Sequence, residues 1–125
     1  MKKVLIATEK PFVSSAVSKI KKIFKKADED YEIKLLEGYL SRKDLLDAVS
    51  DADALIVRSD IIDREVISAS GQLKIVVRAG SGYDNIDLDA ATQKNIVVMN
   101  TPGQNANAVA ELAIGLAIYG LREMF

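Results

Sequence analysis

Five short apolar runs constrain the fold of this chain more than any other sequence feature. They cover residues 3–8, 31–36, 54–57, 74–77 and 96–99, and segments with helical spacing or polar loops lie between them. Strands that alternate with helices through short loops are typical of a parallel sheet with helices on both faces. The five-stranded form of this α/β architecture is flavodoxin-like, with strand order 2-1-3-4-5. We therefore expect that fold here.

Local signals place the expected helices and one edge of the sheet. Ser41, Asp63 and Asp87 each precede a segment with apolar residues at helical spacing, which is the position of an N-cap. Pro11 suits the first turn of another helix. The run 31–36 alternates between apolar and polar residues and ends at Gly38, so it predicts a half-exposed edge strand.

The last segment of the chain differs from the others. From Asn105 to Leu121 the only charged residue is Glu111, and apolar residues surround most of the expected helix. A helix that is apolar on all sides needs cover, and this one is too short and interrupted for a membrane span. We expect the segment Val109–Leu121 to pack against a second copy of the chain or a further domain, and the chain to be a fragment of a longer protein.

The amino-acid composition disfavours several classes of function. The chain has 125 residues and a net charge of −1, so no global basic field favours nucleic acid or a membrane surface. It contains no cysteine and no histidine. Histidine most often performs proton transfer near neutral pH, so the chain alone is a poor candidate for proton-coupled chemistry. The first apolar run is too short for a secretory signal, which makes a cytoplasmic location the expectation.

Two arginines are the strongest functional signal. Arg58 follows the third apolar run, and Arg78 follows the fourth. In the expected strand order these runs are neighbours about 4.8 Å apart, and ligands bind beyond the carboxyl ends of such strands. Two guanidinium groups there suit a phosphate or a carboxylate. The alternative is that each arginine forms an internal salt bridge, for example with Asp53 or Asp84.

The loop after Arg78 contains Gly80-Ser81-Gly82. It does not match a dinucleotide-binding fingerprint, because Asn85 stands at the third glycine position and Asn100 where an acid is required. The loop is either a tight turn or a backbone surface that faces an anion. Downstream, Asn105 is either an N-cap or a polar residue that contacts a ligand.

Four motifs in order resemble the D-2-hydroxyacid dehydrogenase family. They are residues 56–59, 77–87, 98–102 and 108–112. The resemblance implies that residues 1–103 form a substrate-binding domain and residues 104–125 a helix for interdomain contact and dimerisation. The nucleotide-binding domain and the family's catalytic arginine, glutamate and histidine would then be absent from this chain.

The resemblance also implies a set of site residues. Those expected at the substrate are Arg58, Ser59, Arg78, Gly80, Ser81 and Gly82. Ser81 would also lie near the NAD cofactor, and Asn105 would line the cleft beside it. Within the family, the pair of arginines favours a phosphorylated substrate. The implied reaction is the oxidation of D-3-phosphoglycerate to 3-phosphohydroxypyruvate, a step in serine biosynthesis, performed by a homodimer.

Two other functions fit the expected fold. A stand-alone regulatory domain that binds a small anion without catalysis would keep the two arginines. A phosphoacceptor receiver domain has the same strand order but needs acids after the first strand, an aspartate after the third and a lysine after the fifth. Those positions hold Thr8-Glu9, Arg58 and Asn100, which disfavours the receiver.

Overall fold

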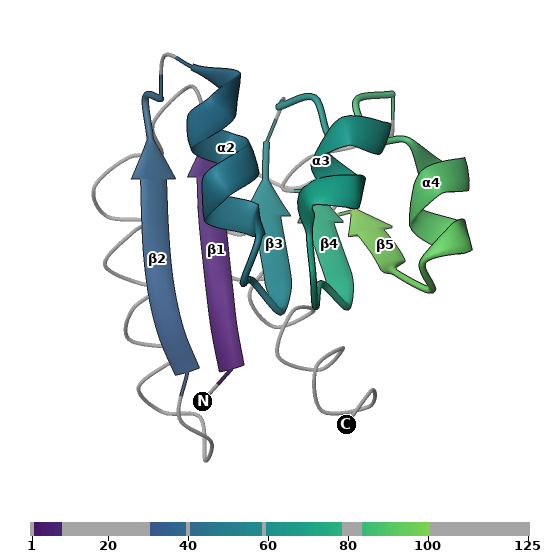
Figure 1. Cartoon of the computed structure of the whole chain (residues 1–125), viewed down its shortest axis with the longest axis horizontal. Coiled ribbons are helices and arrows are strands. Elements are labelled where there is room, and N and C mark those ends of the chain that lie inside the picture. Colours follow the sequence, from purple (N-terminus) through teal and green to yellow (C-terminus); the bar gives the residue numbers. More distant parts are fainter. Residues whose placement is uncertain (1, 9–30, 40, 59, 79–83, 101–125) are drawn as a thin grey trace.

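A five-stranded parallel sheet forms the centre of the molecule. The computed structural model describes residues 2–8, 31–39, 41–58, 60–78 and 84–100. The sheet order is β2-β1-β3-β4-β5 and every pairing is parallel, as the sequence predicted (Figure 1). The strands are β1 (Lys2–Thr8), β2 (Tyr31–Glu37), β3 (Ala54–Val57), β4 (Ile75–Arg78) and β5 (Val97–Asn100). The carboxyl ends of all five strands therefore lie together at one end of the sheet. This end, where the strands stop, is called here the carboxyl edge.

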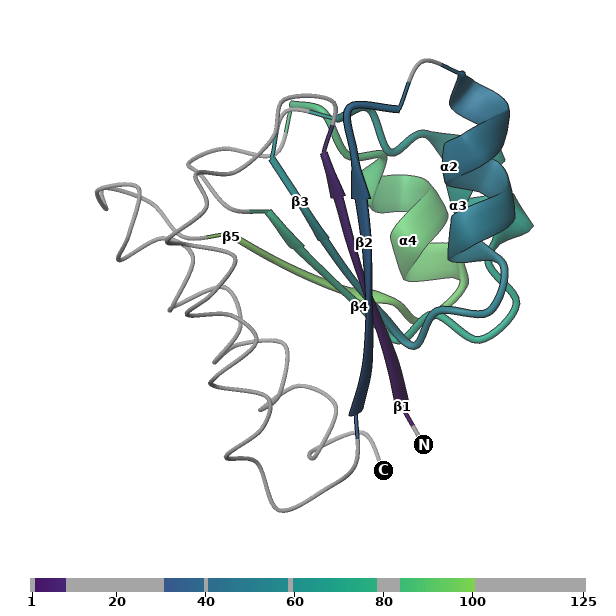
Figure 2. The ribbon, with the colours of Figure 1, turned by 90° about the vertical axis from the view of Figure 1, so that its left-hand side faces the viewer.

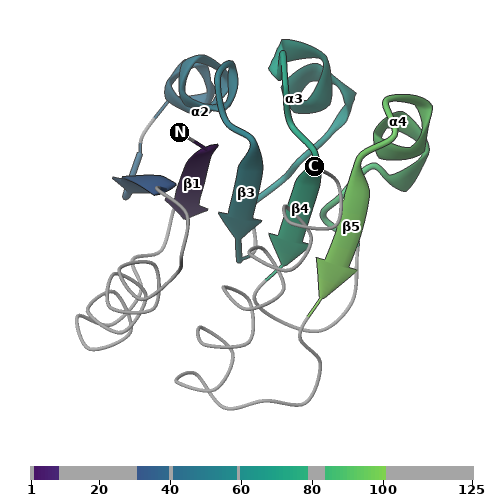
Figure 3. The ribbon, with the colours of Figure 1, turned by 90° about the horizontal axis from the view of Figure 1, so that it is seen from below.

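Three described helices cover one face of this sheet. They are α2 (Arg42–Val49), α3 (Arg64–Ala69) and α4 (Leu88–Gln93), and Figures 2 and 3 show them in a row on the same side. The helices expected after Pro11 and over residues 104–125 lie outside the described residues. Among the residues that the structure does describe, no helix is long and apolar enough to cross a membrane.

The predicted caps are confirmed. The Ser41 hydroxyl accepts a hydrogen bond from the backbone N–H of Lys43, and the Asp63 and Asp87 carboxylates accept from the amides three residues later. Each cap satisfies a backbone donor that the first helical turn leaves without an intrahelical partner. The start of every described helix is thus specified by one local side chain.

One hydrophobic cluster lies between these helices and the middle of the sheet. Leu5, Leu55 and Val76 project from β1, β3 and β4 into one cluster with residues of α2, α3 and α4. All four residues of β3 are buried, whereas β2 and β5 are partly exposed at the two edges of the sheet. The prediction that β2 is an edge strand is confirmed. Gly38 ends it with a backbone φ of 61°, a left-handed conformation that glycine adopts without strain.

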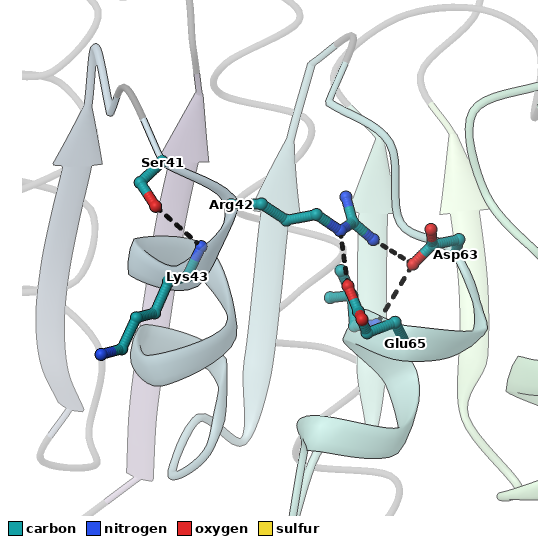
Figure 4. A network of polar contacts seen from close by, with 6 residues as sticks. Ser41, Arg42, Lys43, Asp63 and Glu65 are labelled. Carbon is teal, nitrogen blue, oxygen red and sulfur yellow. Dashed lines mark hydrogen bonds and ion pairs between the residues drawn. The ribbon is translucent and has the colours of Figure 1, made fainter.

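An ion-pair cluster joins the beginnings of α2 and α3 (Figure 4). The Arg42 guanidinium donates to the Glu65 carboxylate at 2.7 Å and also to the Asp63 carboxylate. The hydrogen bond that Arg42 donates to Glu65 and the negative charges of Asp63 and Glu65 raise the pKa of Arg42. All three side chains are partly exposed, so the cluster orients the helix starts more than it stabilises the fold.

Lys94 connects the end of α4 to the end of α3. Its ammonium donates to the carbonyl oxygens of Ile67 at 3.0 Å and Ser70 at 2.6 Å. These carbonyls belong to the C-terminal turn of α3, where a cation also interacts favourably with the helix dipole.

We expect Lys94→Met to lower the free energy of unfolding by about 1 kcal/mol, because the change removes two charge-assisted hydrogen bonds at a partly exposed site. Urea denaturation followed by far-UV circular dichroism measures this change. Lys43→Met, at an exposed position on α2, is the control and should leave the midpoint unchanged. Equal midpoints for the two variants would contradict this role of Lys94.

Candidate functional site at the carboxyl edge

The sheet register brings the two candidate arginines together along the backbone. Arg78 is the last residue of β4 and pairs with Val57 of β3 and with Asn100 of β5. Arg58 is the residue that directly follows Val57. Both arginines are therefore at the carboxyl edge, Arg58 directly after β3 and Arg78 at the end of the neighbouring strand β4, as expected.

An asparagine in the loop after β4 orients the Arg78 side chain. Arg78 lies on the same sheet face as Val76, because residues two apart on a strand share a face. Its Nε–H donates to the Asn85 side-chain oxygen at 2.7 Å. The guanidinium is planar with donors in a fixed arrangement, so this bond restrains the direction of the whole group.

The other end of the same carboxamide holds the loop after β3. The Asn85 side-chain nitrogen donates to the carbonyl oxygen of Arg58 at 3.2 Å and to that of Asp60 at 2.7 Å. An amide has one oxygen that accepts and one nitrogen with two N–H donors. All three described contacts of this side chain match that chemistry, with the oxygen toward the guanidinium and the nitrogen toward two carbonyls.

Backbone pairing continues between the two loops beyond the sheet. The amide of Ile62 donates to the carbonyl of Asn85 at 2.7 Å, and the amide of Asp87 donates to the carbonyl of Ile62 at 2.9 Å. Ile62 and Ile86 form an isolated parallel bridge, and both are buried. The loop that carries Arg58 is consequently fixed to the loop that follows Arg78.

A buried carboxylate, that of Asp60, also restrains the loop that carries Arg58. Asp60 is only 3% exposed. Its carboxylate accepts the Arg58 backbone N–H at 3.4 Å and the Tyr39 hydroxyl at 2.5 Å. Burial of a carboxylate is costly unless hydrogen bonds compensate it. Tyr39 follows β2, so this contact ties the loop after the edge strand to the loop after β3.

One of the alternative partners for the arginines lies elsewhere. Asp53 precedes β3, at the opposite edge of the sheet from Arg58 and Arg78. Its carboxylate accepts the backbone N–H of Lys3 at 2.8 Å and the side-chain amide of Gln72 at 3.2 Å. The proposed salt bridge between Asp53 and either arginine is therefore wrong, because β3 separates them along its length.

A pocket of about 340 Å³ lies near the opposite end of the sheet from the arginines. Its charged lining residues are Lys3, Glu32, Lys34 and Asp51. The Lys3 ammonium donates to the Asp51 carboxylate at 2.8 Å, and this bond lowers the pKa of Asp51 and raises that of Lys3. Two cations balanced by two anions give no preference for an anionic ligand, so the carboxyl edge is the better candidate site.

The remaining expected site residues lie outside the described residues. They are Ser59, Gly80, Ser81, Gly82 and Asn105. Conversely, sequence reasoning missed the contributions of Tyr39, Asp60 and Asn85. In the sequence, Asn85 interrupts a glycine pattern and belongs to the family motif 77–87, and neither feature indicates its contacts. Its position between two loops was a usable signal, since asparagine often bonds to backbone groups in turns.

The family model for the catalytic domain of D-isomer specific 2-hydroxyacid dehydrogenases matches residues 11–118. This match covers most of the chain. The chain belongs to the D-2-hydroxyacid dehydrogenase family. Membership of this family confirms the resemblance that the four motifs indicated.

Two relatives of this D-2-hydroxyacid dehydrogenase domain carry the name D-3-phosphoglycerate dehydrogenase. The chain is 41% identical to the D-3-phosphoglycerate dehydrogenase of Archaeoglobus fulgidus over 123 residues, which is 98% of this chain and 22% of that protein. It is 42% identical to the enzyme of the same name from Methanocaldococcus jannaschii over 98 residues, which is 78% of this chain and 18% of that protein. The chain thus spans about a fifth of the length of these relatives.

A solved structure of the family supports the same assignment. The crystal structure of NAD⁺-bound 3-phosphoglycerate dehydrogenase from Entamoeba histolytica is 52% identical, with a TM-score of 0.79. The match covers 97% of this chain and 39% of that one. Escherichia coli D-lactate dehydrogenase, at 20% identity and a TM-score of 0.66, shares the fold.

We expect Tyr39→Phe to lower the free energy of unfolding of the domain by about 1–2 kcal/mol, because the buried Asp60 carboxylate loses a hydroxyl donor. Chemical denaturation of Tyr39→Phe, Asp60→Asn and the double variant measures the coupling between the two side chains. The combined loss should be smaller than the two single losses added together. Strictly additive losses would show that the hydroxyl and the carboxylate do not act as a pair.

Proposed function

We propose that this chain is the substrate-binding part of an NAD-dependent oxidoreductase that acts on a 2-hydroxy acid, with D-3-phosphoglycerate as substrate and 3-phosphohydroxypyruvate as product. The reaction belongs to serine biosynthesis. The names of the relatives from A. fulgidus, M. jannaschii and E. histolytica support this choice of substrate.

The observation that carries the proposal is the arrangement of Arg58 and Arg78 at the ends of adjacent strands. D-3-phosphoglycerate bears a phosphate and a carboxylate, and guanidinium groups bind both kinds of anion through paired N–H donors. In this proposal Arg58 and Arg78 bind the anionic groups. Ser59 and the backbone of Gly80, Ser81 and Gly82 complete the contacts.

In this proposal the chain binds and orients the substrate rather than transferring its proton. No histidine is present, and we assign no catalytic residue to the chain. NAD supplies the acceptor for the hydride when it is bound. The described residues do not fit a dinucleotide cradle, because the third glycine position is Asn85 and its side chain bonds to Arg78. We therefore assign NAD mainly to residues beyond this chain, with Ser81 and Asn105 as its contacts here.

We further propose that the protein acts in the cytoplasm as a homodimer. Residues 104–125 would form the helix that joins the substrate domain to a nucleotide-binding domain, and the apolar segment Val109–Leu121 would contribute to the dimer interface. The near absence of charge in this segment supports that role.

Arg78→Gln tests the function. In the protein produced from its complete reading frame, this change should lower kcat/KM for D-3-phosphoglycerate by about 10- to 100-fold, because a charged hydrogen-bonding group is lost. The value for D-glycerate, which lacks the phosphate, should fall much less. Steady-state formation of NADH measures both substrates.

The matched control for this experiment is Arg64→Gln. Arg64 is exposed on α3 and bonds to the side chain of Gln93, so its loss should leave both substrates unaffected. An unchanged kcat/KM for D-3-phosphoglycerate in Arg78→Gln would remove Arg78 from the site. Binding of D-3-phosphoglycerate without any NAD-dependent turnover would instead favour a stand-alone anion-binding domain.

A further inference from the structure

We propose that Asn85 is a positioning residue of the arginine site: its carboxamide sets the direction of the Arg78 guanidinium relative to the loop that carries Arg58. This inference rests on the proposed function, because its catalytic consequence is the recognition of a phosphorylated 2-hydroxy acid. The contacts that support it join only residues that the structure describes.

The Asn85 side chain forms hydrogen bonds to the segments that carry both arginines. It accepts from Arg78 Nε at 2.7 Å and donates to the carbonyls of Arg58 at 3.2 Å and Asp60 at 2.7 Å. The three contacts span residues 7 to 27 positions away in sequence. A displacement of either loop would therefore break contacts to the other.

The chemistry of the carboxamide suits this position better than a carboxylate would. An aspartate could accept from the guanidinium, but its second oxygen would then face two carbonyl oxygens and repel them. An aspartate would also place a negative charge directly on Arg78, in competition with an anionic ligand. The neutral amide orients the guanidinium and itself cancels none of the positive charge.

The Arg58 loop has little freedom to compensate for a loss of Asn85. The backbone N–H of Arg58 donates to the Asp60 carboxylate, which also accepts from the Tyr39 hydroxyl. The end of the loop is fixed by the pairing of Ile62 with Ile86. The Asn85 side chain connects this restrained loop to the guanidinium through three hydrogen bonds. Its loss should remove this restraint on Arg78 while the backbone of the Arg58 loop stays in place.

The test compares Asn85→Ala with the parent protein, produced from the complete reading frame and assayed with NAD. We expect KM for D-3-phosphoglycerate to rise about 10-fold, which corresponds to one charge-assisted hydrogen bond, while kcat changes less than about 2-fold. KM for D-glycerate should change little. Lys94→Met, which weakens the fold away from the site, should lower the melting temperature without changing either KM.

A double-mutant cycle assigns the effect to Arg78. If Asn85 acts through that guanidinium, then adding Asn85→Ala to Arg78→Gln should raise KM no further. Asn85→Asp should raise KM at least as much as Asn85→Ala, because the carboxylate repels the two carbonyls and competes for the guanidinium. Independent, multiplicative effects of the two single changes would overturn the inference, as would equal losses for both substrates.

A spectroscopic measurement keeps this inference separate from the proposed function. In ¹⁵N-labelled protein, the Arg78 Nε–H should give a signal protected from exchange with water, and Asn85→Ala should abolish that protection. An unprotected signal in the parent would overturn the positioning role whatever the substrate is. If the parent is protected but neither Arg78→Gln nor the parent shows D-3-phosphoglycerate chemistry, the proposed function fails and the positioning role stands.

Discussion

The parallel pairing of β3 with β4 is the constraint on which the candidate site depends. Neighbouring strands lie about 4.8 Å apart, so residues that are 21 positions apart in the chain become neighbours where both strands stop. Val57 pairs with Arg78, and Arg78 pairs with Asn100. The pairing then continues past the sheet through Ile62 and Ile86. Two loops that would otherwise move independently are thereby held in one relative position.

The fold could be predicted because its determinants are local. Uniformly apolar runs predicted the central strands, and an alternating run predicted the edge strand β2. One polar residue predicted the start of each described helix. The predicted bounds of β4 and β5 were one residue too early. In both cases a polar residue, Arg78 or Asn100, ends the strand and still pairs with its neighbour. A polar side chain marks the end of an apolar run, but it does not end the ladder of backbone hydrogen bonds.

The candidate site could be predicted only in part, because its contacts cross long stretches of sequence. Arg58 and Arg78 were visible as charges at the ends of apolar runs. The function of Asn85 was not visible, since an asparagine in a loop has many local uses and its partners here lie on two different loops. The Tyr39–Asp60 bond joins residues 21 positions apart. No periodic pattern or cap signal in a sequence indicates such a long-range contact between two side chains.

Two arginines near the carboxyl edge show how different partners lead to different uses of the same group. Arg42 donates to the carboxylates of Asp63 and Glu65, so its charge is balanced within the fold and it serves to join α2 to α3. Arg78 donates to the carboxamide of Asn85, a neutral partner that fixes direction without supplying negative charge. An anion site needs both a defined geometry and a positive potential. A carboxylate partner supplies geometry at the expense of positive potential, whereas an amide supplies geometry alone, so the contact with Asn85 is compatible with anion binding by Arg78.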